Sequence, residues 1–171
     1  MKNLSQLLLE ESKTKRPKIN AVSGDNEGFT YDLRKPLGDP EIAKRVGKQL
    51  SKSIQKKGYT QAVGEGLGAY PAIGAITSAP GEVKGGMIRK RRKGYDLNRL
   101  VEGPIDKSKR AVVVDDLVNT GKGLRLALKK CREEGLKIAG AQSIAVLGDP
   151  TEAEEKMNRC GIWFDSLFIF N

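Results

Sequence analysis

Two adjacent carboxylates follow the most apolar segment of the sequence. Residues 111–114 form an uninterrupted run of alanine and valine, which is typical of a strand buried on both faces of a parallel sheet. Asp115 and Asp116 come directly after it, and residues 119–123 then open a predicted helix, whose N-terminal amides and dipole favour a bound phosphate. Carboxylates beside a phosphate would repel it unless they faced hydroxyl groups or a divalent cation. The segment therefore predicts a site for a sugar phosphate with Mg²⁺.

Two other segments combine residue types that bind anions. A glycine-rich stretch at residues 64–68 follows a predicted strand at 60–63. A basic run at residues 89–93, which consists of five Lys or Arg residues and is called the basic segment below, follows a predicted strand at 87–88. In a parallel α/β sheet ligands bind at the carboxyl ends of the strands, so all three segments are expected at one edge of the sheet.

The amino-acid composition excludes several mechanisms. The chain has 171 residues and no histidine, which rules out Ser-His-Asp and Cys-His catalysis, HExxH zinc sites and imidazole as a general base. Chemistry must use carboxylates, lysine, arginine, tyrosine, backbone amides or a bound ion. Cys131 and Cys160 have neither a CxxC nor a metal-ligand spacing, and both are expected to be small buried residues with reduced thiols.

The net charge of +10 is unevenly distributed along the chain. Residues 1–20 carry a net +3 and residues 84–110 a net +7, so the rest of the chain is balanced. A concentrated excess favours a local polyanion site over general binding to nucleic acid or membranes. The apolar runs are too short for a signal peptide or for a membrane span of ~18 residues, so a cytoplasmic protein without membrane contact is expected.

Helical and strand patterns alternate along the chain. Apolar residues at every fourth position from 42 to 54 predict an amphipathic helix between Pro40 and Gly58. Other helices are expected at 69–79, 122–135 and 151–160, other strands at 138–147 and 163–170, and a turn at 24–31. This alternation predicts an α/β fold with a mainly parallel sheet flanked by helices, in one domain over residues 21–171. Residues 1–20 are interpreted as a basic leader, either a docking helix or a mobile tail.

Residues 112–123 resemble the PRPP-binding motif of type I phosphoribosyltransferases. In that motif an apolar strand, two acidic residues and a Thr-Gly loop hold the ribose 5-phosphate of phosphoribosyl pyrophosphate (PRPP). The resemblance extends in order over residues 20–170 and is greatest to the orotate phosphoribosyltransferase branch. Residues 23–24 and 29–34 are similar to that branch's base-side segment, 64–71 to its pyrophosphate loop, and 88–93 with 102–103 to its basic catalytic loop. The resemblance implies a Rossmann-like fold.

The resemblance also implies an activity and a role for each matched residue. The activity is Mg²⁺-dependent transfer of the phosphoribosyl group from PRPP to a nitrogenous base, an orotate-like pyrimidine, with release of pyrophosphate, in a homodimer. The implied catalytic residues are Arg89, Lys90, Lys93, Asp115 and Asp116, of which the two aspartates contact the ribose hydroxyls or the metal's shell. The implied 5-phosphate residues are Asn119, Thr120, Gly121, Lys122 and Gly123. The implied pyrophosphate loop consists of Glu65, Gly66, Leu67, Gly68 and Ala69, in which backbone amides face the ligand. Charge considerations agree, because cations over the departing pyrophosphate would stabilise the transition state.

The chain departs from the family pattern at four positions. Tyr95 stands where the basic loop usually has histidine, and Gly123 replaces a Ser or Thr whose hydrogen bond is worth roughly 0.5–1.5 kcal/mol. Lysines common in the orotate enzymes fall at Gly68 and near Val22. Since the second of these lysines serves an anionic base, the sequence indicates PRPP binding more firmly than it indicates orotate.

The same segments also allow other interpretations. Residues 64–69 fit a loose dinucleotide pattern, but Glu82, the acidic residue about 20 positions on, lies in a Pro-Gly turn. Residues 120–123 fail the P-loop spacing. Asp115 and Asp116 could simply cap the next helix, and the basic segment could be a solvated face or a nucleic-acid patch. The alternative function is therefore a catalytically weak PRPP-binding regulator that contacts RNA or DNA.

Overall fold

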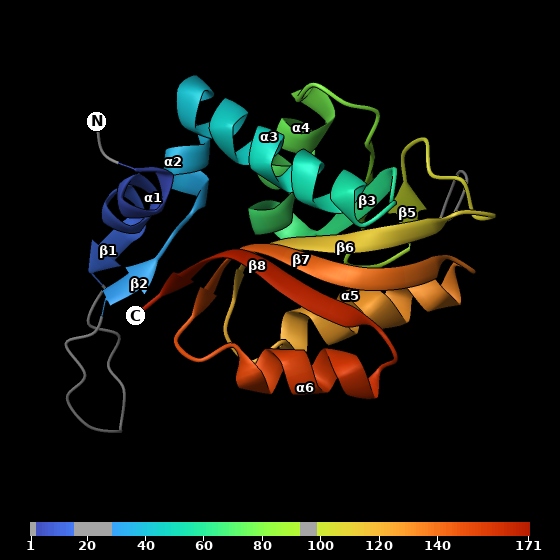
Figure 1. The fold of residues 1–171 in the computed structure, drawn as a ribbon. Coiled ribbons are helices and arrows are strands. Elements are labelled where there is room, and N and C mark those ends of the chain that lie inside the picture. The colour runs from blue at the N-terminus through green and yellow to red at the C-terminus, as the bar shows by residue number, and fades with distance from the viewer. Residues whose placement is uncertain (1–2, 16–28, 93–98) are drawn as a thin grey trace.

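The central element of the fold is a six-stranded sheet flanked by helices (Figure 1). We describe a computed structural model of the chain over residues 3–15, 29–92 and 99–171. The strands lie in the order β5-β4-β3-β6-β7-β8, and every neighbouring pair is parallel except β4 and β5. Their bounds are β3 (Gln61–Glu65), β4 (Lys84–Ile88), β5 (Val101–Glu102), β6 (Arg110–Val118), β7 (Lys137–Leu147) and β8 (Trp163–Phe170). The predicted α/β fold with a mainly parallel sheet is confirmed.

Helices cover both faces of this sheet. The helices α3 (Pro40–Lys56) and α4 (Gly66–Ser78) lie on one face, and α5 (Lys122–Glu133) and α6 (Thr151–Arg159) lie on the other (Figure 1). Side chains of β6 alternate between the two cores that result. Val112 and Val114 pack on the α3–α4 side, whereas Val113 packs on the α5–α6 side. This alternation explains why residues 111–114 are apolar without interruption.

The helix α3 forms where the apolar spacing predicts it. The Asp39 carboxylate caps its N-terminus by accepting hydrogen bonds from the backbone amides of Glu41 at 2.9 Å and Ile42 at 3.0 Å. Gly47 allows a close approach to α4, because a Cβ there would lie 2.1 Å from the carbonyl oxygen of Ala75. The apolar face of α3 is thereby packed against α4.

The N-terminal residues belong to the same core. The helix α1 (Leu4–Ser12) is followed by β1 (Lys13–Lys15), β2 (Phe29–Tyr31) and a short helix α2 (Arg34–Leu37), and β1 and β2 pair antiparallel. Leu8 is fully buried in the cluster that also contains residues of α3 and α4. Residues 4–12 thus form a docking helix, and the turn predicted at 24–31 is wrong for residues 29–31, which are a strand. The proposed boundary at residue 20 falls outside the described residues and stays a prediction.

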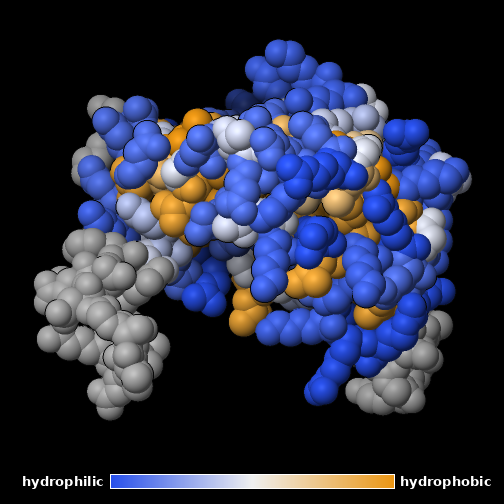
Figure 2. All heavy atoms as spheres, turned by 90° about the horizontal axis from the view of Figure 1, so that it is seen from below, coloured by the Kyte–Doolittle hydropathy of each residue, from blue (hydrophilic) through white to orange (hydrophobic). Residues whose placement is uncertain are grey.

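One face of the molecule is mainly polar. In the view from below, hydrophilic side chains of the described residues cover most of this face, with hydrophobic patches between them (Figure 2). None of the helices that the structure describes is both long and apolar enough to cross a membrane.

Candidate active site

Asp115 and Asp116 lie on β6 in the middle of the sheet, near its carboxyl edge. The strand was expected to end at Asp115 and Asp116, but it continues to Val118, because Leu117 and Val118 still pair with β7. Adjacent residues of a strand face opposite sides of the sheet. The Asp116 carboxylate accordingly lies against Gly68 of α4, and Asp115 lies beside Gly123 of α5. The pair therefore stands between the N-terminal turns of two helices.

Residues 119–123 lead from β6 into the first turn of α5, as predicted. Asn119 and Thr120 connect β6 to the helix, and Gly121 precedes its first residue with a φ of +72°, a conformation that favours glycine. The Lys156 ammonium group of α6 donates a hydrogen bond to the Thr120 carbonyl at 2.8 Å. Among the described residues no side chain caps α5, so its first amides are available to an anion.

The expected pyrophosphate loop is mostly helical. Glu65 is the last residue of β3, and residues 66–69 form the first turn of α4 rather than a free turn. Gly66 has a φ of +84°, and the side chain of Leu67 is 70% exposed. In the part of the chain that the structure describes, no side chain caps α4 either, so a second helix N-terminus points its amides to the same edge of the sheet.

Part of the basic segment lies beside these helix ends. Lys90 lines a hollow of ≈ 230 Å³ together with Glu65, Asp115 and Gly123. The Arg89 guanidinium is 3.9 Å from a carboxylate oxygen of Glu102. Lys93 and Tyr95 lie outside the described residues. The structure thus brings Lys90 to the carboxylates and leaves the expectations for Lys93 and Tyr95 as predictions.

The ionisation of Asp115 reflects this crowded environment. Burial, together with the negative charges of Asp116 and Glu65, raises the pKa of Asp115 from the usual 3.8 to about 8. The amide of Asp116 donates to a carboxylate oxygen of Asp115 at 2.9 Å and opposes this shift. The ionised form of Asp115 would therefore be stabilised by a partner that donates a hydrogen bond to it or brings positive charge.

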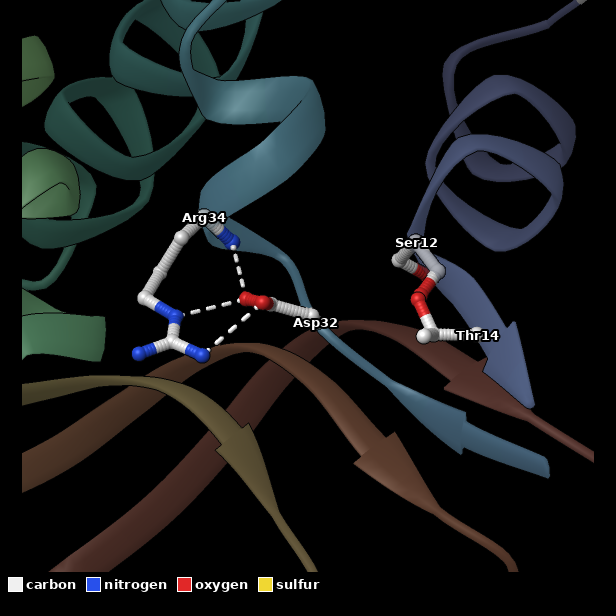
Figure 3. A network of polar contacts seen from close by, with 4 residues as sticks. All are labelled: Ser12, Thr14, Asp32 and Arg34. Atoms are coloured by element: carbon white, nitrogen blue, oxygen red, sulfur yellow. Dashed lines mark hydrogen bonds and ion pairs between the residues drawn. The ribbon is translucent and has the colours of Figure 1, made fainter. Parts of the chain in front are cut away.

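The base-side segment approaches the same edge of the sheet. The Arg34 guanidinium donates from Nε and Nη2 to the two carboxylate oxygens of Asp32, at 2.6 and 2.8 Å (Figure 3). This hydrogen bond raises the pKa of Arg34, and the charge of Asp116 acts in the same direction. The ring of Tyr31 packs 5.5 Å from that of Phe170 at the end of β8. Residues 23–24 of this segment lie outside the described residues.

Sequence reasoning missed one residue at this site, Lys130 of α5. Its ammonium group pairs with Glu65 and donates to the carbonyl oxygen of Arg89 at 3.3 Å. The sequence carried no signal for it, because a lysine beside the buried face of an amphipathic helix is ordinarily a solvated residue.

The chain is similar to known proteins over most of its length. The chain is 30% identical over 156 residues to the orotate phosphoribosyltransferase of Aquifex aeolicus (strain VF5), a match that spans 89% of this chain and 84% of the relative. It is also 30% identical over 168 residues to the orotate phosphoribosyltransferase of Methanosphaera stadtmanae, over 98% of this chain and 93% of the relative. No protein-family model matches the chain.

Solved structures share the fold. The orotate phosphoribosyltransferase of Mycobacterium tuberculosis H37Rv superimposes with a TM-score of 0.85 at 24% identity, over 98% of this chain and 94% of that one. A complex of the same enzyme with PRPP superimposes with a TM-score of 0.79 at 23% identity, over 97% and 93% of the two chains. The fold is therefore that of the type I phosphoribosyltransferases. Within this class, the identity to the two relatives shows that the chain belongs to the orotate phosphoribosyltransferase family.

Proposed function

We propose that this chain transfers the phosphoribosyl group of PRPP to a nitrogenous base, an orotate-like pyrimidine, and releases pyrophosphate. The observation that carries the proposal is the position of Asp115 and Asp116 between the N-terminal turns of α4 and α5. PRPP has a phosphate at one end, a pyrophosphate at the other and hydroxyl groups between them. Two helix N-termini that flank two carboxylates match this order of groups.

The proposed roles follow from these positions. The amides at the start of α5, from Asn119 to Gly123, hold the 5-phosphate. Asp115 and Asp116 accept hydrogen bonds from the ribose hydroxyls, and the first turn of α4 receives the pyrophosphate. As the bond to pyrophosphate breaks, negative charge grows on the leaving group, and Arg89, Lys90 and Lys93 stabilise it electrostatically.

The carboxylates also fit a role for Mg²⁺. Magnesium in such sites keeps several waters and is held by one or two carboxylates together with substrate phosphates. Asp115 and Asp116 supply carboxylate oxygens. The raised pKa of Asp115 reflects its burial first and then the nearby negative charges, which a cation would offset. No cluster of three or more acidic or cysteine side chains that could hold a metal occurs among the described residues, which favours an ion that arrives with PRPP. When bound, Mg²⁺ would neutralise charge on the pyrophosphate.

An assay with several acceptor bases tests the proposal. The protein is incubated with PRPP, Mg²⁺ and a panel of purine and pyrimidine bases including orotate, and pyrophosphate release is followed. We expect release with orotate or a related pyrimidine. The Asp115→Asn, Asp116→Asn double variant should remain folded and lose PRPP affinity in calorimetry. Binding of PRPP without release of pyrophosphate with any base would overturn the transfer reaction, and unchanged affinity in the double variant would overturn the site.

The proposed function also carries expectations for the oligomeric state of the protein and for its location in the cell. A homodimer is expected, because in this family the basic loop often reaches the site of the neighbouring subunit, and sedimentation would show two chains per particle. The location is expected to be the cytoplasm, with no membrane partner.

A second candidate function is a regulator that binds PRPP and contacts RNA or DNA. The observation that favours it is the exposed face of α3, which presents Lys44, Arg45, Lys48, Lys52 and Lys56. Charge variants of α3 and of the basic segment, compared in RNA retention and in turnover, separate the two functions.

A further inference from the structure

Lys130 joins three segments at the carboxyl edge of the sheet. It lies on α5, and its ammonium group pairs with the Glu65 carboxylate at the end of β3 and donates to the Arg89 carbonyl after β4. The Lys130 and Glu65 side chains are only 21% and 20% exposed. An ion pair this sheltered from water is screened less than a surface pair. Its loss would leave a poorly solvated carboxylate without its counter-charge.

A second contact, just beyond the end of the same helix, supports this role. Glu134, the residue that follows α5, lies 2.6 Å from the Arg92 guanidinium, and the Glu134 side chain is 7% exposed. Lys130 and Glu134 therefore hold residues 89–92 at two points with opposite charges. The described part of the basic segment is thus fixed to α5.

The charge of Glu65 matters because of its position. Glu65 directly precedes α4, where the pyrophosphate is proposed to bind, and it lines the same hollow as Lys90 and Asp115. An unpaired carboxylate there would repel a pyrophosphate that carries several negative charges. It would also oppose the favourable dipole of the α4 N-terminus.

We propose that Lys130 is a positioning residue of the PRPP site, which neutralises Glu65 and fixes the backbone of Arg89 so that α4 and the basic segment can receive pyrophosphate. The inference rests on the proposed function. Lys130 acts through Glu65 and Arg89 and is not assigned any contact with PRPP.

Calorimetry with inorganic pyrophosphate and with PRPP, each with Mg²⁺, tests this role. The variant Lys130→Met keeps the length of the side chain and removes its charge, and we expect the dissociation constants of both ligands to rise about tenfold. Lys129→Met is the matched control, because Lys129 is the preceding residue of α5 and is 74% exposed, and it should change them by less than about twofold. Lys130→Arg should retain most of the affinity. Turnover of Lys130→Met should show a raised KM for PRPP and a kcat within about threefold of the unmodified protein, as a loss of binding predicts.

The double variant Lys130→Met, Glu65→Gln separates charge from packing. It removes both charges but does not restore the bond to the Arg89 carbonyl, so most of the lost pyrophosphate affinity should return, and the part that stays lost measures that bond. Equal weakness in the single and double variants would overturn the inference, as would unchanged affinity in Lys130→Met. Lys130→Gln provides the same comparison if Lys130→Met does not fold. Failure of the unmodified protein to bind PRPP would overturn the proposed function and this inference with it, whereas normal binding with an insensitive Lys130 overturns the inference alone.

Discussion

The carboxyl group of Asp115 lowers the free energy of unfolding at neutral pH, and replacing Asp115 should reveal this effect. Its pKa is about 8 in the folded chain and 3.8 ordinarily, so the folded state binds more protons between these values. Stability therefore falls as the pH rises through that window. Asp115→Asn stays neutral throughout. We expect its stability advantage to grow from about pH 4 to pH 8 and to reach roughly 1–3 kcal/mol, less than the full shift implies because the side chain is only partly buried. Urea unfolding at several pH values measures it, and PRPP binding should be lost in the same variant.

Asp149→Asn is the control with the opposite sign. The Thr151 hydroxyl donates to the Asp149 carboxylate at 2.6 Å and holds the pKa of Asp149 below its usual value. A lowered pKa contributes stability above the ordinary value of 3.8 that is lost as the pH falls through the folded one. Asp149→Asn should thus be slightly less stable near neutral pH, with the difference vanishing in acid. A parallel pH dependence in both variants would contradict the assignment for Asp115.

Gly68 and Gly64 should respond differently to alanine. A Cβ at Gly68 would lie 2.4 Å from an Asp116 carboxylate oxygen, which can move at small cost because it ends a flexible side chain. Gly68→Ala should therefore keep its stability within about 1 kcal/mol, since alanine favours a helix, and weaken PRPP binding about tenfold by displacing Asp116. A Cβ at Gly64 would lie 2.9 Å from both Ala69 Cβ and Ile73 Cγ1, so Gly64→Ala should lose roughly 1–3 kcal/mol of stability. Thermal unfolding and calorimetry compare the two. Unchanged PRPP affinity in Gly68→Ala would remove Asp116 from the site.

At the scale of elements, the contribution of α1 can be measured at Leu8. This side chain is fully buried in the core shared with α3 and α4, so Leu8→Ala should destabilise the protein by about 2–4 kcal/mol. Glu11→Ala on the exposed side of α1 should change stability by less than about 0.5 kcal/mol. Equal effects in urea unfolding would show that α1 is not docked in solution and that residues 1–20 form a separate leader.

The regular elements with a periodic pattern could be predicted from sequence. The helix from Pro40, the strand around residues 111–114 and the strand Trp163–Phe170 occur where their apolar spacing indicates, because burial against a sheet imposes that spacing. The helix α1 was predicted only as one of two alternatives for the leader, since three consecutive leucines among polar residues have no helical period. The pairing of β1 with β2 joins residues 13–15 to 29–31, and a contact so distant in sequence leaves no local signal.

The sequence predicts which segments form the site but not how these segments are arranged in space. Adjacent acids after a strand and a Thr-Gly turn before a helix marked Asp115, Asp116 and residues 119–123. Asp116 lies against the N-terminus of α4 and Asp115 beside that of α5 because these helices cover opposite faces of the sheet, and that is a property of the tertiary fold. The ion pair of Glu65 with Lys130 joins residues 65 positions apart, so neither sequence segment alone predicts it.

At the scale of the whole molecule, the small sheet of β1 and β2 lies at the carboxyl edge of the main sheet (Figure 1). Tyr31 contacts Phe170 at that edge, and the Asp32 amide donates to the Ser12 carbonyl at 2.8 Å. The helix α1 thus supports the segment that carries Arg34. Packing of the N-terminal residues is in this way connected to the base side of the proposed site.

The distribution of charge over the molecule separates an enzyme from a regulator. Segment counts suggest a balanced body, yet α3 gathers five exposed cations and has one acidic residue, Glu41. We expect the double variant Lys48→Glu, Lys52→Glu to keep turnover within about twofold of the unmodified protein. It should retain less of a roughly 20-nucleotide RNA at about 50 mM salt. The remaining RNA binding should be lost near 200 mM salt, because raising the salt from about 50 to about 200 mM removes non-specific phosphate contacts. Arg89→Ala with Lys90→Ala should lower kcat/KM for PRPP by about a hundredfold and leave RNA retention largely intact. A different outcome would instead establish the regulator: a chain without turnover whose RNA binding responds to PRPP, requires Lys48 and Lys52, and survives about 200 mM salt. Weak, non-specific contacts by one basic helix alone would not survive salt at that concentration.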